Sequence, residues 1–281
     1  MNRPTVRQRP QRLLITILGD YWRGRTDPIP SAALVKIMAE FDIRPEGTRS
    51  ALSRLGRRGL LVRTKKGRRT YYGLTQRALR TLDEGAAHIF GFGTDQRPWD
   101  GQWTVVVFSV AERERAQRHV LRTRLRWLTF APLYDAVWVS PHDEREAVAE
   151  LLQELGIDHA TILRAAVVNH SPGDDDLLGV WDLDSLRDAY ESFLDAFTPL
   201  RDRVARGEVS PSEALVARTQ VMDAWRAFPR EDPDLPARFL PADWPRDAAR
   251  QLFVEVYDAL APAAEARFKD LVTQDEDDIT A

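Results

Sequence analysis

The segment 43–60 combines residue types that bind nucleic acid with the spacing of a helix. Pro45 suits the first turn of a helix, and Gly56 or Gly59 can end it. At 3.6 residues per turn, one side holds Thr48, Ala51, Leu52 and Leu55, and the other holds Glu46, Arg49, Ser50, Ser53, Arg54 and Arg57. Arginine bonds guanine edges and phosphates, and serine donates to phosphate oxygens. The polar side therefore predicts a helix that lies in the major groove of DNA.

The charge of this polar side differs from that of most solvated helix faces. It carries three arginines against one glutamate, whereas a solvated face normally mixes acids with bases. A basic surface helix without a ligand is the alternative, and the segment alone leaves it open. The residues on either side favour the DNA-binding interpretation.

A predicted hairpin follows the basic helix. Residues 60–64 and 70–74 are rich in strand formers, and a glycine-containing turn separates them. The turn carries four cations, Lys65, Lys66, Arg68 and Arg69. Such a tip fits the wing of a winged helix-turn-helix lying on a minor groove or on the sugar-phosphate backbone. A turn kept soluble by its charge is the alternative, but the helix and the hairpin favour DNA independently.

The residues before the basic helix predict two supporting helices. The apolar run 13–22 indicates a buried helix, and residues 27–31 indicate a turn. Ser31 is a good N-cap for a second helix over 32–41, after which residues 42–44 form a short turn. Two helices, a short turn and a basic helix follow the order of a helix-turn-helix.

The overall charge of −3 conceals an asymmetry along the chain. Residues 1–82 hold 19 Lys and Arg against 5 Asp and Glu, a balance of +14, and the remaining residues have a balance of −17. The first third therefore favours a polyanionic partner, whereas the rest would repel one.

Composition excludes several other classes of protein. The 281 residues contain no cysteine, so neither disulfides nor thiolate metal sites stabilise the chain. No apolar run approaches the roughly 20 residues that cross a bilayer, and the basic N-terminus lacks the apolar core of a signal peptide. We expect a cytoplasmic protein without a membrane partner.

The chain beyond residue 99 alternates strands and helices. Strands are expected over 103–110, 136–140 and 161–168, with helices over 112–128 and 143–155, which indicates a ferredoxin-like layer. In the first of these helices Arg115, Arg118, Arg122 and Arg126 form a stripe. This stripe can bind a ligand phosphate, a second subunit or DNA, or it can be a solvated face.

The remainder is helical, and the sequence predicts an α+β protein. Amphipathic helices are expected over 181–197, 212–228 and 247–260, and a proline-rich loop joins the last two. The predicted parts are a winged helix-turn-helix over 1–88, a ferredoxin-like middle domain over 99–172, a helical domain over 177–273 and an acidic tail over 274–281.

Four blocks in chain order resemble the PaaX-type transcriptional regulators, a family named for the repressor of bacterial phenylacetic acid degradation operons. The blocks are T-R-S-A-L-S-R-L-G-R-R-G-L-L at 48–61, W-D-G-Q-W at 99–103, A-V-W-V-S-P at 136–141 and W-R-A-F-P-R-E-D-P-D-L-P-A-R-F-L-P-A-D-W-P at 225–245. The resemblance implies a homodimeric, sequence-specific repressor of double-stranded operator DNA. It also implies that an acyl-CoA effector such as phenylacetyl-CoA binds the C-terminal domain and relieves repression, with no other cofactor.

The resemblance carries DNA contact over to the polar helix face and the wing cations, but it does not identify the effector pocket. Aromatic side chains can stack on an aryl or adenine group. The candidates by chemistry are Trp181, Tyr190, Trp225, Phe239 and Trp244, together with the phosphate-binding candidates Arg115, Arg118 and Arg122. Ordinary core or loop packing is the alternative for each aromatic residue.

Two rival functions remain. The resemblance relates the middle domain to CRISPR-associated nucleases that use a carboxylate at the end of the first strand to bind a divalent metal. Here that strand ends without an acid before Glu112, so we expect no nuclease and no enzyme. The second rival is a non-specific DNA-packaging protein. A further alternative keeps the DNA-binding function but responds to a different effector.

Overall fold

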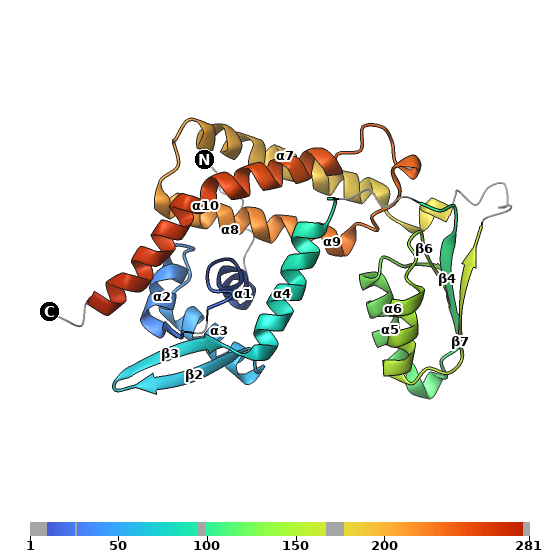
Figure 1. Cartoon of the computed structure of the whole chain (residues 1–281), viewed down its shortest axis with the longest axis horizontal. Coiled ribbons are helices and arrows are strands. Elements are labelled where there is room, and N and C mark those ends of the chain that lie inside the picture. Colours follow the sequence, from blue (N-terminus) through green and yellow to red (C-terminus); the bar gives the residue numbers. More distant parts are fainter. Residues whose placement is uncertain (1–9, 26, 95–98, 167–176, 278–281) are drawn as a thin grey trace. The chain divides into compact units, whose positions relative to one another are not determined.

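The computed structural model describes residues 10–25, 27–94, 99–166 and 177–277. It consists of two compact units (Figure 1). The first unit comprises residues 1–91, 193–226 and 248–281, and the second comprises residues 92–192 and 227–247. Most of the basic N-terminus, residues 95–98 and residues 167–176, which include the end of the strand expected over 161–168, lie outside the described residues.

The N-terminal part of the first unit is a winged helix. Its elements are α1 (Pro10–Tyr21), β1 (Ile29–Pro30), α2 (Ser31–Ala39), α3 (Pro45–Arg57), β2 (Leu61–Lys66), β3 (Arg69–Leu74) and α4 (Gln76–Gly91). The three strands form a sheet in the order β1-β3-β2. Leu14, Ile17, Leu34 and Ile37 are fully buried between the helices. The predicted order of helix, helix, basic helix and hairpin is confirmed.

The entry into α2 differs from the prediction. Ile29 and Pro30 are strand β1, paired antiparallel with Tyr72 and Tyr71, where the sequence indicated a turn. The N-cap of α2 is Pro30, and Ser31 is already the first helical residue, so the predicted Ser31 cap is wrong. Pairing with β3 holds Pro30 in an extended conformation, and the chain passes directly from strand to helix.

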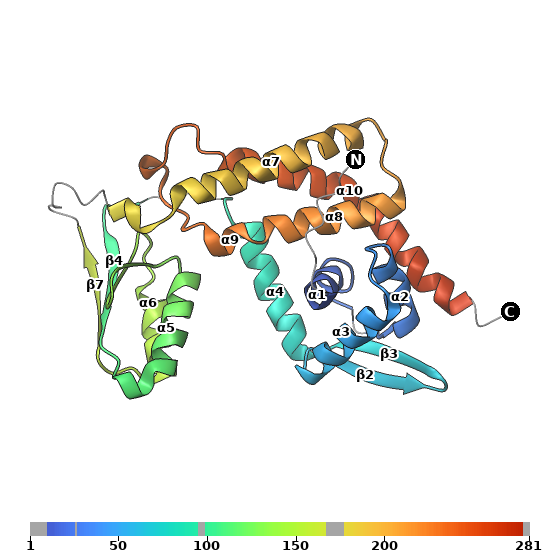
Figure 2. The same ribbon diagram turned by 180° about the vertical axis from the view of Figure 1, so that it is seen from behind.

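C-terminal helices complete the first unit. They are α8 (Pro211–Trp225) and the parts of α7 (Leu183–Ala205) and α10 (Arg246–Asp277) that begin at Phe193 and Ala248. Helix α8 packs against α1, as seen from both sides in Figures 1 and 2. Trp225 is fully buried, stacks on Phe253 at 4.8 Å between ring centroids and donates its indole N–H to the carbonyl of Ile89 at 3.3 Å.

A polar cluster lies where α1 meets α8 and α10. The Tyr257 hydroxyl donates to Asp20 Oδ1 at 3.0 Å, and the Arg218 guanidinium lies 3.7 Å from the centre of the Tyr257 ring. Asp20 Oδ2 is buried and accepts no hydrogen bond from any residue that the structure describes. Burial therefore raises the pKa of Asp20 to about 6, against the opposing attraction of Arg218.

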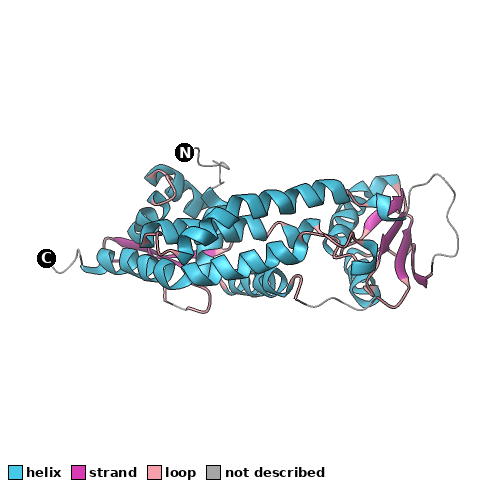
Figure 3. Cartoon of the chain, turned by 90° about the horizontal axis from the view of Figure 1, so that it is seen from above, coloured by secondary structure: helices cyan, strands magenta, loops and turns pink. Residues whose placement is uncertain are grey.

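The second unit contains a ferredoxin-like layer, and Figure 3 marks its strands in magenta. Its elements are β4 (Trp103–Phe108), α5 (Arg115–Trp127), β5 (Ala131–Tyr134), β6 (Val137–Ser140), α6 (Arg145–Leu155) and β7 (Ala160–Ala165). The antiparallel strand order β5-β6-β4-β7 is that of a βαββαβ unit. The sequence did not predict β5, but the α+β fold class is confirmed.

Short helices and the start of α7 complete the second unit. The short helices are η2 (Leu177–Val180), α9 (Phe228–Glu231) and η3 (Ala237–Phe239). Tyr190 is buried, stacks on Phe228 at 4.1 Å and donates its hydroxyl to Asp232 Oδ2 at 2.6 Å. Residues expected to form one helical domain over 177–273 thus fall in both compact units, and the predicted domain boundaries remain a proposal.

None of the described helices is long and apolar enough to cross a membrane.

The Asp20 cluster predicts a pH-dependent stability. Because the pKa of Asp20 is higher in the folded chain than the usual 3.8, the folded state binds the proton more tightly. This stabilisation is complete below about pH 4 and is lost as the pH rises through about 6. We expect wild type to lose about 2–3 kcal/mol of unfolding free energy relative to Asp20→Asn over this range.

Urea denaturation at several pH values measures this difference. Glu84→Gln, which removes an exposed carboxylate from α4, is the control and should retain the wild-type pH dependence. Parallel pH profiles for wild type and Asp20→Asn would show that burial of Asp20 has no energetic consequence.

Candidate nucleic-acid interface

Helix α3 buries one face and exposes the other as its sequence predicts. The buried residues are Thr48, Ala51, Leu52 and Leu55, and the exposed residues are Glu46, Arg49, Ser50, Ser53, Arg54 and Arg57. The small side chains of Thr48 and Ala51 allow close packing, while the two leucines fill the core. The packing of the apolar face therefore determines which side chains face solvent.

The ends of α3 are fixed by local chemistry. Arg44 is the extended N-cap residue, and Pro45 occupies the first turn. At the other end Gly59 has a φ of 68°, a conformation that favours glycine, and the Leu60 N–H donates to the carbonyl of Leu55 at 3.0 Å. Gly59 thus ends the helix, whereas Gly56 lies within it.

The arginines of α3 are available for an external partner. Arg49 Nη1 lies 4.0 Å from Glu46 Oε1, and both side chains are largely exposed, so this pair contributes little. Neither Arg54 nor Arg57 forms an ion pair with any residue in the described part of the chain. Two guanidinium groups on a rigid helix can therefore bind base edges or phosphates.

The predicted hairpin is also present. Strands β2 and β3 pair from Leu61↔Leu74 to Lys66↔Arg69, with a two-residue loop whose first residue, Gly67, has a φ of 59°. Lys65, Lys66 and Arg68 are exposed, and Arg69 is half-buried. The Lys66 amino group lies 5.5 Å from the ring centre of Tyr71. A regular two-stranded ribbon thus extends a cluster of cations away from the core.

Two further exposed cations lie near this surface, and the sequence analysis did not single them out. Arg58 is the C-cap residue of α3, and Arg63 lies on β2. Strand alternation places Arg63 on the same face of the hairpin as Lys65. The two-residue spacing of Arg63 and Lys65 was the signal in the sequence that could have identified Arg63.

The aromatic candidates for effector binding do not form one group. Trp225 belongs to the core of the first unit, where it is fully buried. In the second unit the rings of Tyr190 and Trp244 meet edge to face at 6.3 Å. Trp181 and Phe239 both contact Trp103, at centroid distances of 5.9 and 5.5 Å. The candidates therefore occupy three separate aromatic clusters.

The arginine stripe of α5 is used partly within the second unit. Arg118 Nη2 donates to the carbonyl of Val110 at 2.6 Å, and Arg122 Nη2 donates to the carbonyl of Asp135 at 2.9 Å. Arg115 and Arg126 are exposed, and the Arg126 guanidinium lies 5.3 Å from the ring centre of Trp138. Two of the four arginines thus bind backbone carbonyls of the same unit.

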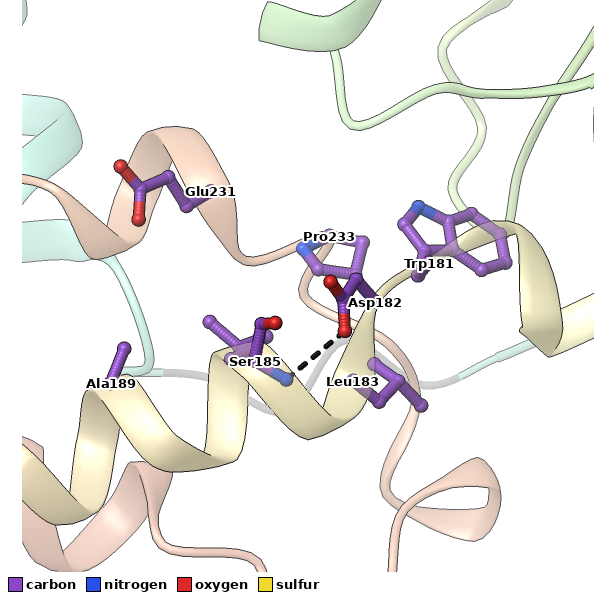
Figure 4. A pocket seen from close by; sticks show the side chains of 8 residues that line it. Trp181, Asp182, Leu183, Ser185, Ala189, Glu231 and Pro233 are labelled. Carbon is purple, nitrogen blue, oxygen red and sulfur yellow. Dashed lines mark hydrogen bonds between the residues drawn. The ribbon is translucent and has the colours of Figure 1, made fainter.

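A pocket of about 220 Å³ opens beside the start of α7 (Figure 4). Its lining consists of Trp181, Asp182, Leu183, Ser185, Leu186, Ala189, Glu231 and Pro233. Asp182 Oδ1 accepts the Ser185 N–H at 3.1 Å, which caps α7 and lowers the pKa of Asp182. Since its two charged lining residues are both acids, the pocket suits an uncharged or cationic group better than a phosphate.

The first strand of the ferredoxin-like layer, β4, ends at Phe108, and the following residues to Ala111 contain no acid. Among the residues that the structure describes, no group of three or more His, Asp or Glu side chains is placed to hold a metal ion.

The three parts of the chain match one protein family. Residues 9–78 match the PaaX-like protein, residues 96–177 match the PaaX protein central Cas2-like domain, and residues 181–270 match the PaaX-like protein C-terminal domain. The chain belongs to the PaaX family. The resemblance noted from the four sequence blocks is thereby confirmed, and the middle domain is described as Cas2-like.

Two known proteins are similar to this chain over most of its length. It is 27% identical over 258 residues to "Transcriptional repressor PaaX" of Escherichia coli (strain K12), covering 90% of this chain and 80% of that protein. It is also similar to the structure of "Uncharacterized protein Rv0674 from Mycobacterium tuberculosis", with 25% identity and a TM-score of 0.57, covering 90% of this chain and 96% of the other.

Gly67 provides a test of the hairpin geometry. An added Cβ would meet no atom within 4 Å, but a φ of 59° is unfavourable for an L-residue. We therefore expect Gly67→Ala to lower the free energy of unfolding by about 1–2 kcal/mol, measured by urea denaturation.

Gly85→Ala is the matched control, because Gly85 lies inside α4 and an added Cβ would again meet no atom within 4 Å. Alanine should stabilise this helical position by about 0.5–1 kcal/mol. Equal effects of the two substitutions would contradict the left-handed geometry at Gly67.

Proposed function

We propose that this protein is a sequence-specific transcriptional repressor that binds double-stranded operator DNA through α3 and the β2–β3 hairpin. The observation that carries the proposal is the exposed face of α3, on which Arg54 and Arg57 have no ion pair with any described residue. The name of the E. coli relative supports the role of repressor.

The two basic surfaces have different tasks in this proposal. A helix enters the major groove, where each base pair has a distinct pattern of donors and acceptors, so Arg49, Arg54 or Arg57 reads bases. Ser50 and Ser53 donate to phosphates beside the groove. The cations of the hairpin contact the backbone, which supplies affinity but no sequence information.

The proposed repressor is a homodimer whose α3 helices read two half-sites. Half-sites of helix-turn-helix dimers lie about one helical turn of DNA apart, or a multiple of it. The negative balance of residues 83–281 supports DNA contact confined to the N-terminal part, since most of the remaining surface repels phosphates. The chain acts as a regulator and not as a nuclease in this proposal.

The proposed effector is an acyl-CoA such as phenylacetyl-CoA, as the PaaX family resemblance implies. A ligand shifts an equilibrium only through different affinities for two states, so the effector must bind the DNA-free conformation more tightly. The acids beside the pocket at Trp181 oppose the phosphates of coenzyme A but not an aryl group. Trp181 is therefore better suited to the acyl part of such a ligand.

Arg54→Ala and Lys65→Ala should separate base reading from phosphate binding. We expect Arg54→Ala to weaken binding to the DNA upstream of the protein's own gene about 10- to 100-fold, with little effect on a scrambled duplex. Lys65→Ala should weaken both duplexes equally and reduce the salt slope by about one. Fluorescence anisotropy at several salt concentrations measures both effects.

Lys65 is preferred to Lys66 for this comparison because Lys66 also contacts the Tyr71 ring. Equal losses on both duplexes for Arg54→Ala would contradict base reading by α3. A wild-type protein that binds the two duplexes equally at physiological salt would favour the DNA-packaging alternative.

Release by the effector is the second test of the proposed function. We expect phenylacetyl-CoA to dissociate the protein from its upstream DNA, because the aryl group supplies the differential affinity, whereas acetyl-CoA should not. Titration of the preformed complex followed by anisotropy measures release. Release by both thioesters would assign recognition to the coenzyme A part, and release by neither would contradict this effector.

A further inference from the structure

Glu40 joins the helix-turn-helix to the C-terminal helices of the first unit. It is the C-cap residue of α2, and its Oε2 accepts a hydrogen bond from the Ser212 hydroxyl of α8. Its Oε1 accepts hydrogen bonds from Nη2 and Nε of Arg267 in α10, the second at 3.1 Å. We call these three residues the Glu40 clasp. It connects parts of the chain that are 172 and 227 residues apart in sequence.

The clasp differs from the surface ion pairs of the winged helix. The side chains of Glu40 and Arg267 are only 14% and 29% exposed, whereas those of Glu46 and Arg49 are 79% and 68% exposed. Partial burial raises the pKa of Glu40, but the hydrogen bonds from Ser212 and Arg267 outweigh it and lower the pKa overall. The carboxylate is thus held charged between two helices that lie outside the winged helix.

The clasp lies directly before α3. Residues 41–44 connect Glu40 to α3, and this connection is tight because Asp42 has a φ of 60° and the Ile43 N–H donates to the carbonyl of Met38 at 3.1 Å. A stiff, short turn transmits a displacement of its first residue to the helix that follows. The position of Glu40 therefore constrains the start of α3.

The first helix of the winged helix is anchored to the same C-terminal helices. Arg12 Nε donates to Asp223 Oδ1 of α8 at 2.9 Å, and Arg226 donates to Thr16 Oγ1 at 2.6 Å. The Tyr257 hydroxyl of α10 bonds Asp20 at the other end of α1. Since α1 and the α2–α3 turn are both attached to α8 and α10, a change in these helices can reorient α3 relative to α1.

We propose that Glu40 is a positioning residue for operator binding, and that its clasp with Ser212 and Arg267 makes the orientation of α3 depend on the arrangement of α8 and α10. This inference rests on the proposed DNA-binding function and adds to it the structural connection through which the C-terminal helices control that function. Base reading requires a fixed orientation of α3, whereas phosphate binding by the hairpin tolerates small displacements. Loss of the clasp should therefore reduce specificity more than affinity for DNA in general.

The experiment compares operator and scrambled duplexes, with wild type, Glu40→Gln and Arg267→Met at the same salt concentration. We expect both variants to lower the ratio of operator to scrambled affinity about tenfold while leaving scrambled binding within about twofold. Glu84→Gln, which removes the same charge elsewhere on the winged helix, should keep the wild-type ratio. Anisotropy gives the affinities, and circular dichroism at the same temperature shows whether each variant is folded.

A charge exchange keeps the test independent of net charge. The double variant Glu40→Lys with Arg267→Glu has the wild-type net charge and can re-form an ion pair at the same place, so it should recover most of the operator preference. Ser212→Ala, which keeps the ion pair and is the mildest change, should give a smaller loss of the ratio. It serves as the folded variant if Glu40→Gln does not fold.

The possible outcomes separate the inference from the proposed function. If wild type prefers the operator but the clasp variants keep its ratio, or lose both affinities equally, the positioning role of Glu40 is overturned. Failure of the charge exchange to recover any preference overturns it as well. If wild type shows no preference for its upstream DNA, the proposed function fails first and the inference fails with it.

Discussion

The burial of one face of α3 is the constraint on which the proposed DNA-binding surface depends. Thr48, Ala51 and Leu55 are fully buried, so the helix cannot rotate without removing apolar side chains from the core. Since an unpaired arginine cannot be buried at low cost, the opposite face must remain in solvent. The same packing that stabilises the winged helix thus fixes the direction in which its guanidinium groups point, and the β2–β3 hairpin extends from the same core through buried Leu61.

The parts of this surface that could be predicted are those encoded by local spacing. The two faces of α3 follow from a period of 3.6 residues, and the hairpin follows from strand formers on either side of Gly67. The ferredoxin-like order follows from alternating strands and helices, although β5 was missed. Ala131–Tyr134 contains Pro132 and shifts register against β6, so it lacks the regular alternation by which a strand is recognised.

The contacts between distant segments could not be predicted, because no periodicity relates residues two hundred positions apart. Glu40 and Arg267 each look like ordinary charges on a helix. Likewise, nothing in the sequence around Asp20 indicates that the Tyr257 hydroxyl donates a hydrogen bond to it. For the same reason aromatic chemistry alone could not separate Trp225, which fills the core of the first unit, from Trp181, which lines a pocket in the second. Burial depends on tertiary packing, so two residues of the same type can lie in different environments.

The energies of these contacts limit how the proposed effector could relieve repression. A hundredfold loss of operator affinity requires about 2.8 kcal/mol of difference between two states. Breaking a fully buried ion pair costs about 3–5 kcal/mol, but the Glu40 clasp is partly exposed, so its loss costs about 1–2 kcal/mol. The clasp alone therefore falls short of full release. An effector that also displaces α1 from α8 and α10, where Asp223 and Tyr257 hold it, acts on enough contacts to reach that difference.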